Sequence, residues 1–289
     1  MLEITWTGTD GSTWDLMSGA IALRSAEIQG FGMPTTADTI RTTALNHGQT
    51  LQSWRLDPRP VFLPLVFQDN ATYDVEGLQR DFWHSMQVGE YGTLTVTDGN
   101  GYNRSLECRF VDDGNLSYSF DPYAPVLPTK GFGVNLIADN PFWQGEVQSV
   151  EFGLGTEGTA TFFGNGSGAT PFYIVKSAGG TDATLTNIGD LPAWITWTIT
   201  APMTSFDLEV DGHHVTGAIP LTTGETLTIE TSPLQQIAYK QDGTRVTRLL
   251  TDADFAPLPA SGLPVPIGID IVGTGTVTAT FRPQFMRAF

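Results

Sequence analysis

The chain has 289 residues, of which 40% are hydrophobic, enough for about two domains with buried cores and too many for a disordered chain. Its 31 acidic residues outnumber 14 basic ones, for a formal net charge of -17. Such a surface argues against proteins that bind nucleic acid or anionic lipid, because both need a basic patch. A single cysteine excludes an intrachain disulfide.

The pattern of the first half of the chain predicts short strands separated by the turn residues Gly, Pro, Asp and Asn. Extended segments are predicted at residues 3–7, 13–16, 20–28, 60–67, 92–97, 105–111 and 134–138. Asp98-Gly99-Asn100-Gly101 is a strong hairpin signal between two of them. Pro60 and Pro64 predict that the apolar run around them is an edge strand or a bent one.

One segment, at about residues 74–88, is predicted to be a helix. Val75, Leu78, Phe82 and Met86 recur at a spacing that places them on one face of a 3.6-residue period. Asp74 can cap the start and Gly89 can end the helix. We expect this face to cover one side of an N-terminal sheet.

The composition of the sequence changes near residue 145: the residues that follow are rich in Gly and Thr, alternate between apolar and polar, and show no helical period. Strands are predicted there at 159–163, 172–175, 183–185, 194–199, 206–210, 225–229 and 274–281. Their length and spacing are typical of a β-sandwich. The expected fold is therefore mainly β: a sandwich or barrel-like domain with one helix at 1–145, and a β-sandwich at 146–289.

A glycine motif, Gly153-Leu154-Gly155-Thr156-Glu157-Gly158, matches the pattern of a dinucleotide-binding loop. That chemistry needs a helix directly after the glycines, so that its amide groups hold pyrophosphate. Here a predicted strand follows. We interpret the motif as a loop between strands, and we expect no cofactor.

Residues in two further patterns are of the types that bind metal ions. His213 and His214 are adjacent, and on a strand adjacent side chains point to opposite faces, which prevents them from sharing one ion. The loop that starts at Asp98 resembles a calcium loop, but the positions that would supply its fifth and last ligands hold Tyr102 and Arg109. We therefore expect no metal site.

No catalytic residues are predicted either. Cys108 is flanked by Glu107 and Arg109 in a strand-like run, which favours a small core residue over a nucleophile. Trp194 and Trp197 lie three positions apart, so on a strand one faces the core and the other is partly exposed. An exposed tryptophan could stack on a sugar ring or lie at a subunit interface.

The N-terminal residues lack the basic start and apolar stretch of a signal peptide, and no segment has the apolar length of a membrane span. We expect a soluble protein that is synthesised in the cytoplasm and does not insert into membranes.

The order of features resembles the distal tail protein (Dit) family of siphophages, particularly members from phages of actinobacteria. The resemblance runs along nearly the whole chain. In the first half it is carried by residues 3–7, Asp10-Gly11, Trp14, 30–34, the arginine-bearing stretch 55–65, the single helix, 92–96, 104–109 and 139–143. In the second half it is carried by 185–190, Trp194, Asp211-Gly212 and 281–285. Residues 258–264 depart from the family's usual Pro-Gly-x-Asn turn.

The resemblance implies a ring, commonly of six subunits, that joins the tail tube to the tip or baseplate in the virion. The N-terminal domain would form the ring and line the channel, and a galectin-like C-terminal domain would project outward. Implied partners are further copies of the chain, the tail tube protein and the tail-tip hub protein, with the tape measure protein as a further candidate. An acidic lining would let DNA pass without binding.

Two other functions stay open from the residues alone. A carbohydrate-binding β-sandwich would recognise the host surface, and it predicts an exposed aromatic platform in the second half. A cell-wall hydrolase would need a catalytic constellation, such as paired carboxylates, and no such pair stands out in the sequence.

Overall fold

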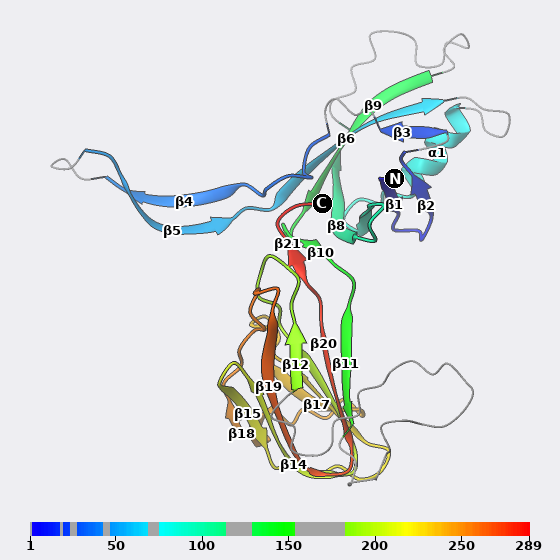
Figure 1. Ribbon diagram of the computed structural model, residues 1–289. Helices are drawn as coiled ribbons and strands as arrows, with labels where there is room; N and C mark the ends of the chain where they lie inside the picture. The colour runs from blue at the N-terminus through cyan, green and yellow to red at the C-terminus, as the bar shows by residue number, and fades with distance from the viewer. Residues whose placement is uncertain are drawn as a thin grey trace. The chain divides into compact units, whose positions relative to one another are not determined.

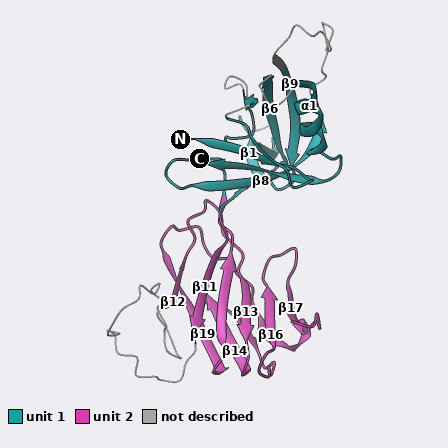
Figure 2. Cartoon of the chain, turned by 90° about the vertical axis from the view of Figure 1, so that its right-hand side faces the viewer, with its two compact units in different colours: residues 1–145, 285–289 teal, residues 146–284 magenta. Residues whose placement is uncertain are grey.

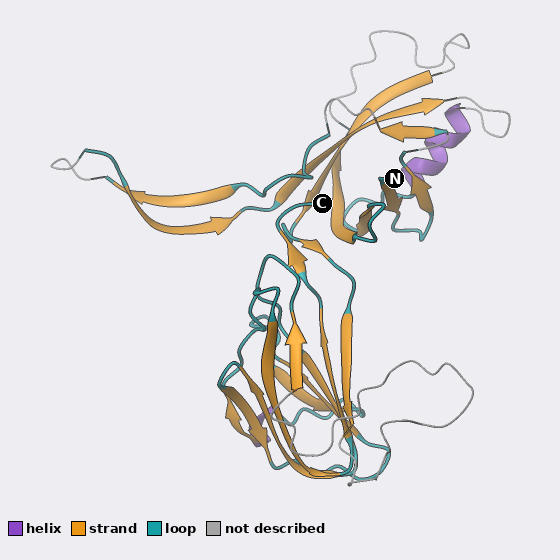
Figure 3. Ribbon diagram, in the orientation of Figure 1, coloured by secondary structure: helices purple, strands orange, loops and turns teal. Residues whose placement is uncertain are grey.

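The computed structural model describes residues 2–17, 20–23, 28–42, 47–68, 75–113, 129–153 and 183–289. In those residues the protein is mainly β, with one α-helix, which confirms the predicted fold class (Figure 3). The predicted strands at 159–163 and 172–175, the cap at Asp74 and all but the first residue of the glycine motif lie outside the described residues. The chain divides into two compact units: unit 1 contains residues 1–145 and 285–289, and unit 2 contains residues 146–284 (Figure 2).

Unit 1 is built from a large antiparallel sheet, a helix and a separate two-stranded sheet (Figure 1). The path of the large sheet is β2-β1-β7-β8-β9-β6-β3, and the short β10 and β21 complete it. The elements are β1 (Glu3–Thr7), β2 (Thr13–Asp15), β3 (Ile21–Leu23), β4 (Thr36–Arg41), β5 (Thr50–Leu56), β6 (Arg59–Gln68), α1 (Val75–His84), β7 (Tyr91–Thr97), β8 (Asn103–Asp112), β9 (Thr129–Ala138), β10 (Trp143–Gln144) and β21 (Gln284–Phe285).

The large sheet curls until its two ends meet. The backbone N–H of Leu23, on β3, donates to the carbonyl of Leu16, just after β2, at 2.8 Å. Strict alternation gives this sheet one apolar face: Ile4 and Trp6 on β1 and Leu94 on β7 are buried, while their sequence neighbours face outward. The result is a nearly closed barrel with an apolar interior.

Strand β6 lies between β9 and β3, so of the two predicted alternatives, an edge strand or a bent one, the first does not hold for the strand as a whole. Phe62 exchanges two backbone hydrogen bonds with Gln29, at 3.1 and 3.3 Å, on the β3 side. The backbone hydrogen-bonding positions of Pro60 and Pro64 face the same side as those of Phe62, because these positions alternate along a strand. Strand β3 pairs only with residues 65–67, so neither proline stands where the ladder needs a donor.

The helix is shorter than predicted, since α1 ends at His84. All four residues of the predicted apolar face are nevertheless buried: Val75, Leu78, Phe82 and Met86. Ser85 accounts for the early end. Its hydroxyl accepts a hydrogen bond from the Trp6 indole at 3.1 Å, and its carbonyl accepts one from the Thr9 amide at 3.0 Å. Among the described residues, no helix has the length and apolar character of a membrane span.

Unit 2 contains two five-stranded antiparallel sheets, ordered β11-β20-β13-β16-β17 and β12-β19-β14-β15-β18. Its elements are β11 (Gln148–Gly153), β12 (Ala183–Thr186), β13 (Thr196–Thr200), β14 (Met203–Val210), β15 (His213–Gly217), β16 (Thr226–Glu230), β17 (Ile237–Lys240), the 3-10 helix η1 (Thr247–Leu249), β18 (Leu250–Ala253), β19 (Pro264–Gly273) and β20 (Thr276–Phe281).

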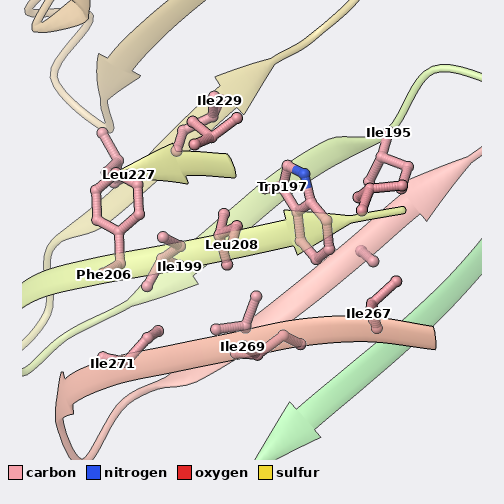
Figure 4. Close-up of a cluster of buried hydrophobic side chains, with 14 of the residues drawn as sticks. Ile195, Trp197, Ile199, Phe206, Leu208, Leu227, Ile229, Ile267, Ile269 and Ile271 are labelled. Carbon is pink, nitrogen blue, oxygen red and sulfur yellow. The ribbon is translucent and has the colours of Figure 1, made fainter. Parts of the chain in front are cut away.

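The two sheets of unit 2 share one core. Trp197 and Ile199 from the first sheet and Leu208 and Ile269 from the second belong to the same buried cluster (Figure 4). Each strand contributes every second residue, which is the pattern of a β-sandwich. The predicted strands of this half are present at 183–185, 194–199, 206–210, 225–229 and 274–281, with ends shifted by up to three residues.

Candidate functional site

Strands β4 and β5 form a separate two-stranded ribbon, which we call the arm (Figure 1). Eleven of the thirteen residues in its two strands are exposed, and the other two, Ala37 and Leu56, are half-buried. An isolated two-stranded ribbon is marginally stable in water at best. The arm is therefore the part of unit 1 with the least support from its own chain.

The two faces of the arm differ in chemistry. One face carries the cross-strand pairs Thr36–Leu56, Asp38–Trp54 and Ile40–Leu51, and the other carries Ala37–Arg55, Thr39–Ser53 and Arg41–Thr50. On the first face Trp54 is 60% exposed, Leu51 53% and Ile40 47%. The second face is polar and carries two arginines. The arm is thus an amphipathic ribbon whose apolar face is open to solvent.

A β-bulge keeps the apolar face continuous. The register shifts between Thr39 and Ile40, so that Gln52 is the extra residue of β5 and Leu51 pairs with Ile40. Without the bulge, Gln52 would oppose Ile40, because side chains alternate along a strand. The bulge returns Leu51 to the face that carries Trp54.

The outer face of the barrel is a second candidate surface, which we call the threonine face. It consists of the outward residues of β1, β7 and β8, namely Glu3, Thr5, Thr7, Thr93, Thr95, Thr97, Asn103, Ser105 and Glu107. They are in register in three rows across the strands. This face offers hydroxyl groups and carboxylates.

The arginine at the end of the threonine face is neutralised. Arg109 binds Asp139 through its Nε at 3.1 Å, and the Tyr91 hydroxyl also hydrogen-bonds Asp139. Both contacts lower the pKa of Asp139, with Arg109 the larger cause. The carboxylate is therefore ionised at neutral pH and offsets the guanidinium charge.

The two adjacent histidines contact different carboxylates. His213 contacts Asp254 and His214 contacts Asp207, each at 2.9 Å, on opposite faces of β15. No group of three or more potential metal ligands occurs in the described residues. The two side chains connect β15 to β14, through Asp207, and to the residue directly after β18, Asp254.

The other polar candidates have structural roles. Asp98 accepts hydrogen bonds from the backbone amides of Asn100 and Tyr102, at 2.8 and 3.0 Å, and so closes the predicted hairpin. Cys108 is fully buried, and that burial raises the pKa of its thiol to about 12. A thiol that stays protonated at neutral pH is a poor nucleophile.

The tryptophans of unit 2 divide as expected. Trp197 is buried in the core, whereas Trp194 is half-buried. In the described part of unit 2, the large apolar side chains that are exposed are all aliphatic. The aromatic platform that a carbohydrate-binding sandwich predicts is thus not found among these residues.

Sequence reasoning missed the arm. Its strands bury neither face, so they lack the apolar alternation by which strands are recognised. A usable signal was present: two Thr-containing runs with Ile40, Leu51 and Trp54 flank a turn at His47-Gly48, where Gly48 has a φ of 92°.

Neither a protein-family model nor a curated protein matches the sequence. Solved structures do match the fold. The Dit protein of phage SPP1, described as a paradigm of the hub of the adsorption apparatus in phages that infect Gram-positive bacteria, aligns with a TM-score of 0.63 and 12% identity over 99% of each chain. This chain has the fold of a phage distal tail protein. The predicted resemblance to the Dit family is confirmed at that level.

Two further solved structures that align with this chain belong to the baseplate of phage P2 in its activated conformation. One, with Ca, aligns with a TM-score of 0.53 over 98% of both chains, and the other, with Sr, with 0.51 over 98%. Identity is 10% in each case. The shared fold covers both units, so the likeness is not confined to one common sandwich.

Proposed function

We propose that this protein is a structural, non-enzymatic component of a phage tail tip that assembles into a ring, of six subunits as the family resemblance implies. The ring joins the tail tube to the tip proteins, with the tape measure protein as a further contact. The observation that carries the proposal is the Dit fold over 99% of the chain, in a protein that also presents an uncovered arm.

The arm supplies the contact between subunits. Its apolar face places Trp54, Leu51 and Ile40 side by side in solvent. Covering such side chains contributes about 25 cal/mol per Å² of apolar surface, and aromatic residues are enriched where subunits meet. A neighbouring copy that covers this face also supplies the additional layer that a two-stranded ribbon needs.

Charge favours another copy of the same chain as the partner. The arm carries Arg41 and Arg55 against Asp38, so it is net positive on a chain of formal charge -17. The side chain of Arg55 is 80% exposed, although it also forms an ion pair at 3.6 Å with Asp57, the residue directly after β5. The arginines of the arm favour contact with the acidic body of a neighbouring copy, whereas two acidic bodies repel each other.

The threonine face is our candidate for the channel lining. Its outward carboxylates, Glu3 and Glu107, repel phosphate, and Arg109 at the end of the face is paired with Asp139. Threonine and serine hydroxyls present no net charge. A wall of this composition lets DNA pass without holding it.

The arm is tested by a double variant, Leu51→Ser with Trp54→Ser. Wild-type protein is expected to form rings in negative-stain images and a defined oligomer in analytical ultracentrifugation. The double variant is expected to sediment as a monomer. Its unfolding free energy should stay within about 0.5 kcal/mol of wild type, because the replaced side chains are exposed in the monomer.

Leu234→Ser is the matched control, because Leu234 is 98% exposed but belongs to unit 2. It should form rings like wild type. A wild-type protein that stays monomeric at high concentration, even beside its tube and tip partners, would contradict the ring. Normal rings from the arm double variant would contradict the arm as the contact.

A further inference from the structure

Residues 285–289 complete unit 1, although they follow the whole of unit 2 in the sequence. Phe285 and Ala288 are 4% and 2% exposed, and both belong to the hydrophobic core of unit 1. Phe289, the next residue, is 62% exposed. The segment is therefore built into the core.

A buried arginine holds this segment in place. Arg59, at the start of β6, is 1% exposed. Its guanidinium donates to the carbonyls of Gly30 and Gly32 at 2.8 and 2.5 Å, of Pro141 at 2.6 Å, and of Met286 at 2.8 Å. A buried cation is costly unless its donors are satisfied, and here the segment supplies one of the acceptors.

A second arginine covers the segment from β8. The guanidinium of Arg104 lies 3.8 Å from the centre of the Phe285 ring and donates to the carbonyl of Arg287 at 2.9 Å. The backbone amide of Ala288 donates to the carbonyl of Phe31 at 3.0 Å. Side chains from β6 and β8 and the loop after β3 thus converge on these few residues.

The order of the sequence makes this arrangement consequential. Synthesis proceeds from the N-terminus at about 5–20 residues per second, so unit 2 takes on the order of ten seconds to make. During that time Arg59 lacks Met286 and the core lacks Phe285. Unit 1 then has all its strands except β21, but an incomplete core.

We propose that residues 285–289 act as a folding latch: unit 1 reaches its stable, assembly-competent form only after unit 2 has been synthesised. Because of the latch, a subunit can assemble with its neighbours only after both of its units have been synthesised. The part of this inference that concerns assembly rests on the proposed ring; the part that concerns folding does not.

Hydrogen exchange on the full chain tests the latch. In Phe285→Ala, amide protection in β6, β9 and β1 should fall by about 100-fold or more, because a large buried ring is lost and Arg104 loses its cover. Protection in β13 and β16 of unit 2 should stay within about twofold of wild type. A variant that ends at Gln284 should show the larger loss in the same strands, up to complete exchange of unit 1.

Phe289→Ala is the matched control, since Phe289 is exposed and lies in the same segment. It should exchange like wild type. Unchanged protection of unit 1 in the variant that ends at Gln284 would overturn the latch, and so would an equal loss in both units. Because exchange is measured whether or not rings form, failure of the ring proposal leaves a distinct result: monomers whose unit 1 still depends on the segment.

Discussion

The two units use similar strands but differ in how completely they cover themselves. In the described part of unit 2, two sheets bury their inner faces against each other, and the buried polar residues are Asn187 and Thr231. Unit 1 buries a charged residue, Arg59, leaves the arm open and takes core residues from beyond unit 2. In the described residues, the core of unit 2 comes from unit 2 alone, whereas unit 1 draws core residues from a later segment and, in our proposal, relies on a neighbouring subunit.

Composition on the outer faces does not explain the difference. The outward side chains of β13 and β20 include Thr196 beside Thr280 and Thr198 beside Thr278, much as β1 and β7 pair threonines in unit 1. Threonine suits an outward strand position, and cross-strand threonine pairs stabilise a sheet modestly. What separates the units is the surface that each leaves uncovered.

The largest effect is expected from a cavity in the core of unit 2, and it tests whether the two units unfold separately. Trp197→Ala removes the largest buried side chain of unit 2 and should destabilise that unit by about 4 kcal/mol. In denaturant, followed by hydrogen exchange, the transition of unit 2 should move to lower concentration while that of unit 1 stays in place. A shift of both transitions together would break the comparison, since it would mean that the units unfold as one.

A smaller effect is expected from overpacking unit 1. A Cβ at Gly92 would lie 2.3 Å from the Trp6 ring and 2.8 Å from the Thr7 carbonyl, so Gly92→Ala should cost about 2 kcal/mol. At Gly131, on β9, the nearest atom would be 3.7 Å away. Gly131→Ala is therefore the control and should be nearly neutral. Equal thermal shifts for the two variants would contradict the packing of β7 against Trp6.

The smallest expected effect is a titration in unit 2. The hydrogen bond to Asp207 raises the pKa of His214 above its ordinary value of about 6.5. Protonated His214 is thus favoured in the folded state. The stabilisation that the protonated His214 gives to the folded state is complete below the pKa of the unfolded chain and is lost as pH rises through the pKa of the folded chain. NMR titration should show the raised pKa in wild type and its return toward the ordinary value in Asp207→Asn. Asp254→Asn, which removes the partner of His213, should leave the His214 titration unchanged.

Sequence patterns predicted the elements whose cause is local. Alternation around Ile4 and Trp6 predicted β1, and the spacing of Leu78 and Phe82 predicted the helix, because burial on one face leaves a periodic trace. The hairpin at Asp98 followed from its turn residues. In each case the signal and the structure lie within a few residues of each other.

Features that depend on distant partners were not predictable in this way. The end of α1 is decided by Ser85 meeting Trp6 and Thr9, and the inner position of β6 by pairing with β9 on one side and β3 on the other. Arg59 is buried against the usual preference of a charged residue, because its acceptors come from three separate segments. The arm left no periodic trace because neither face is buried within the chain.

The bulge in the arm has a consequence for how this region can vary. The apolar face depends on a count of residues, with Gln52 as the one that returns Leu51 to the side of Trp54. Exchanging one exposed side chain for another leaves that count intact. Deleting or inserting a single residue between Trp54 and Leu51 moves every later side chain of β5 to the opposite face and splits the apolar stripe. The arm should therefore tolerate exchanges among apolar side chains on this face more readily than a change of length in this stretch.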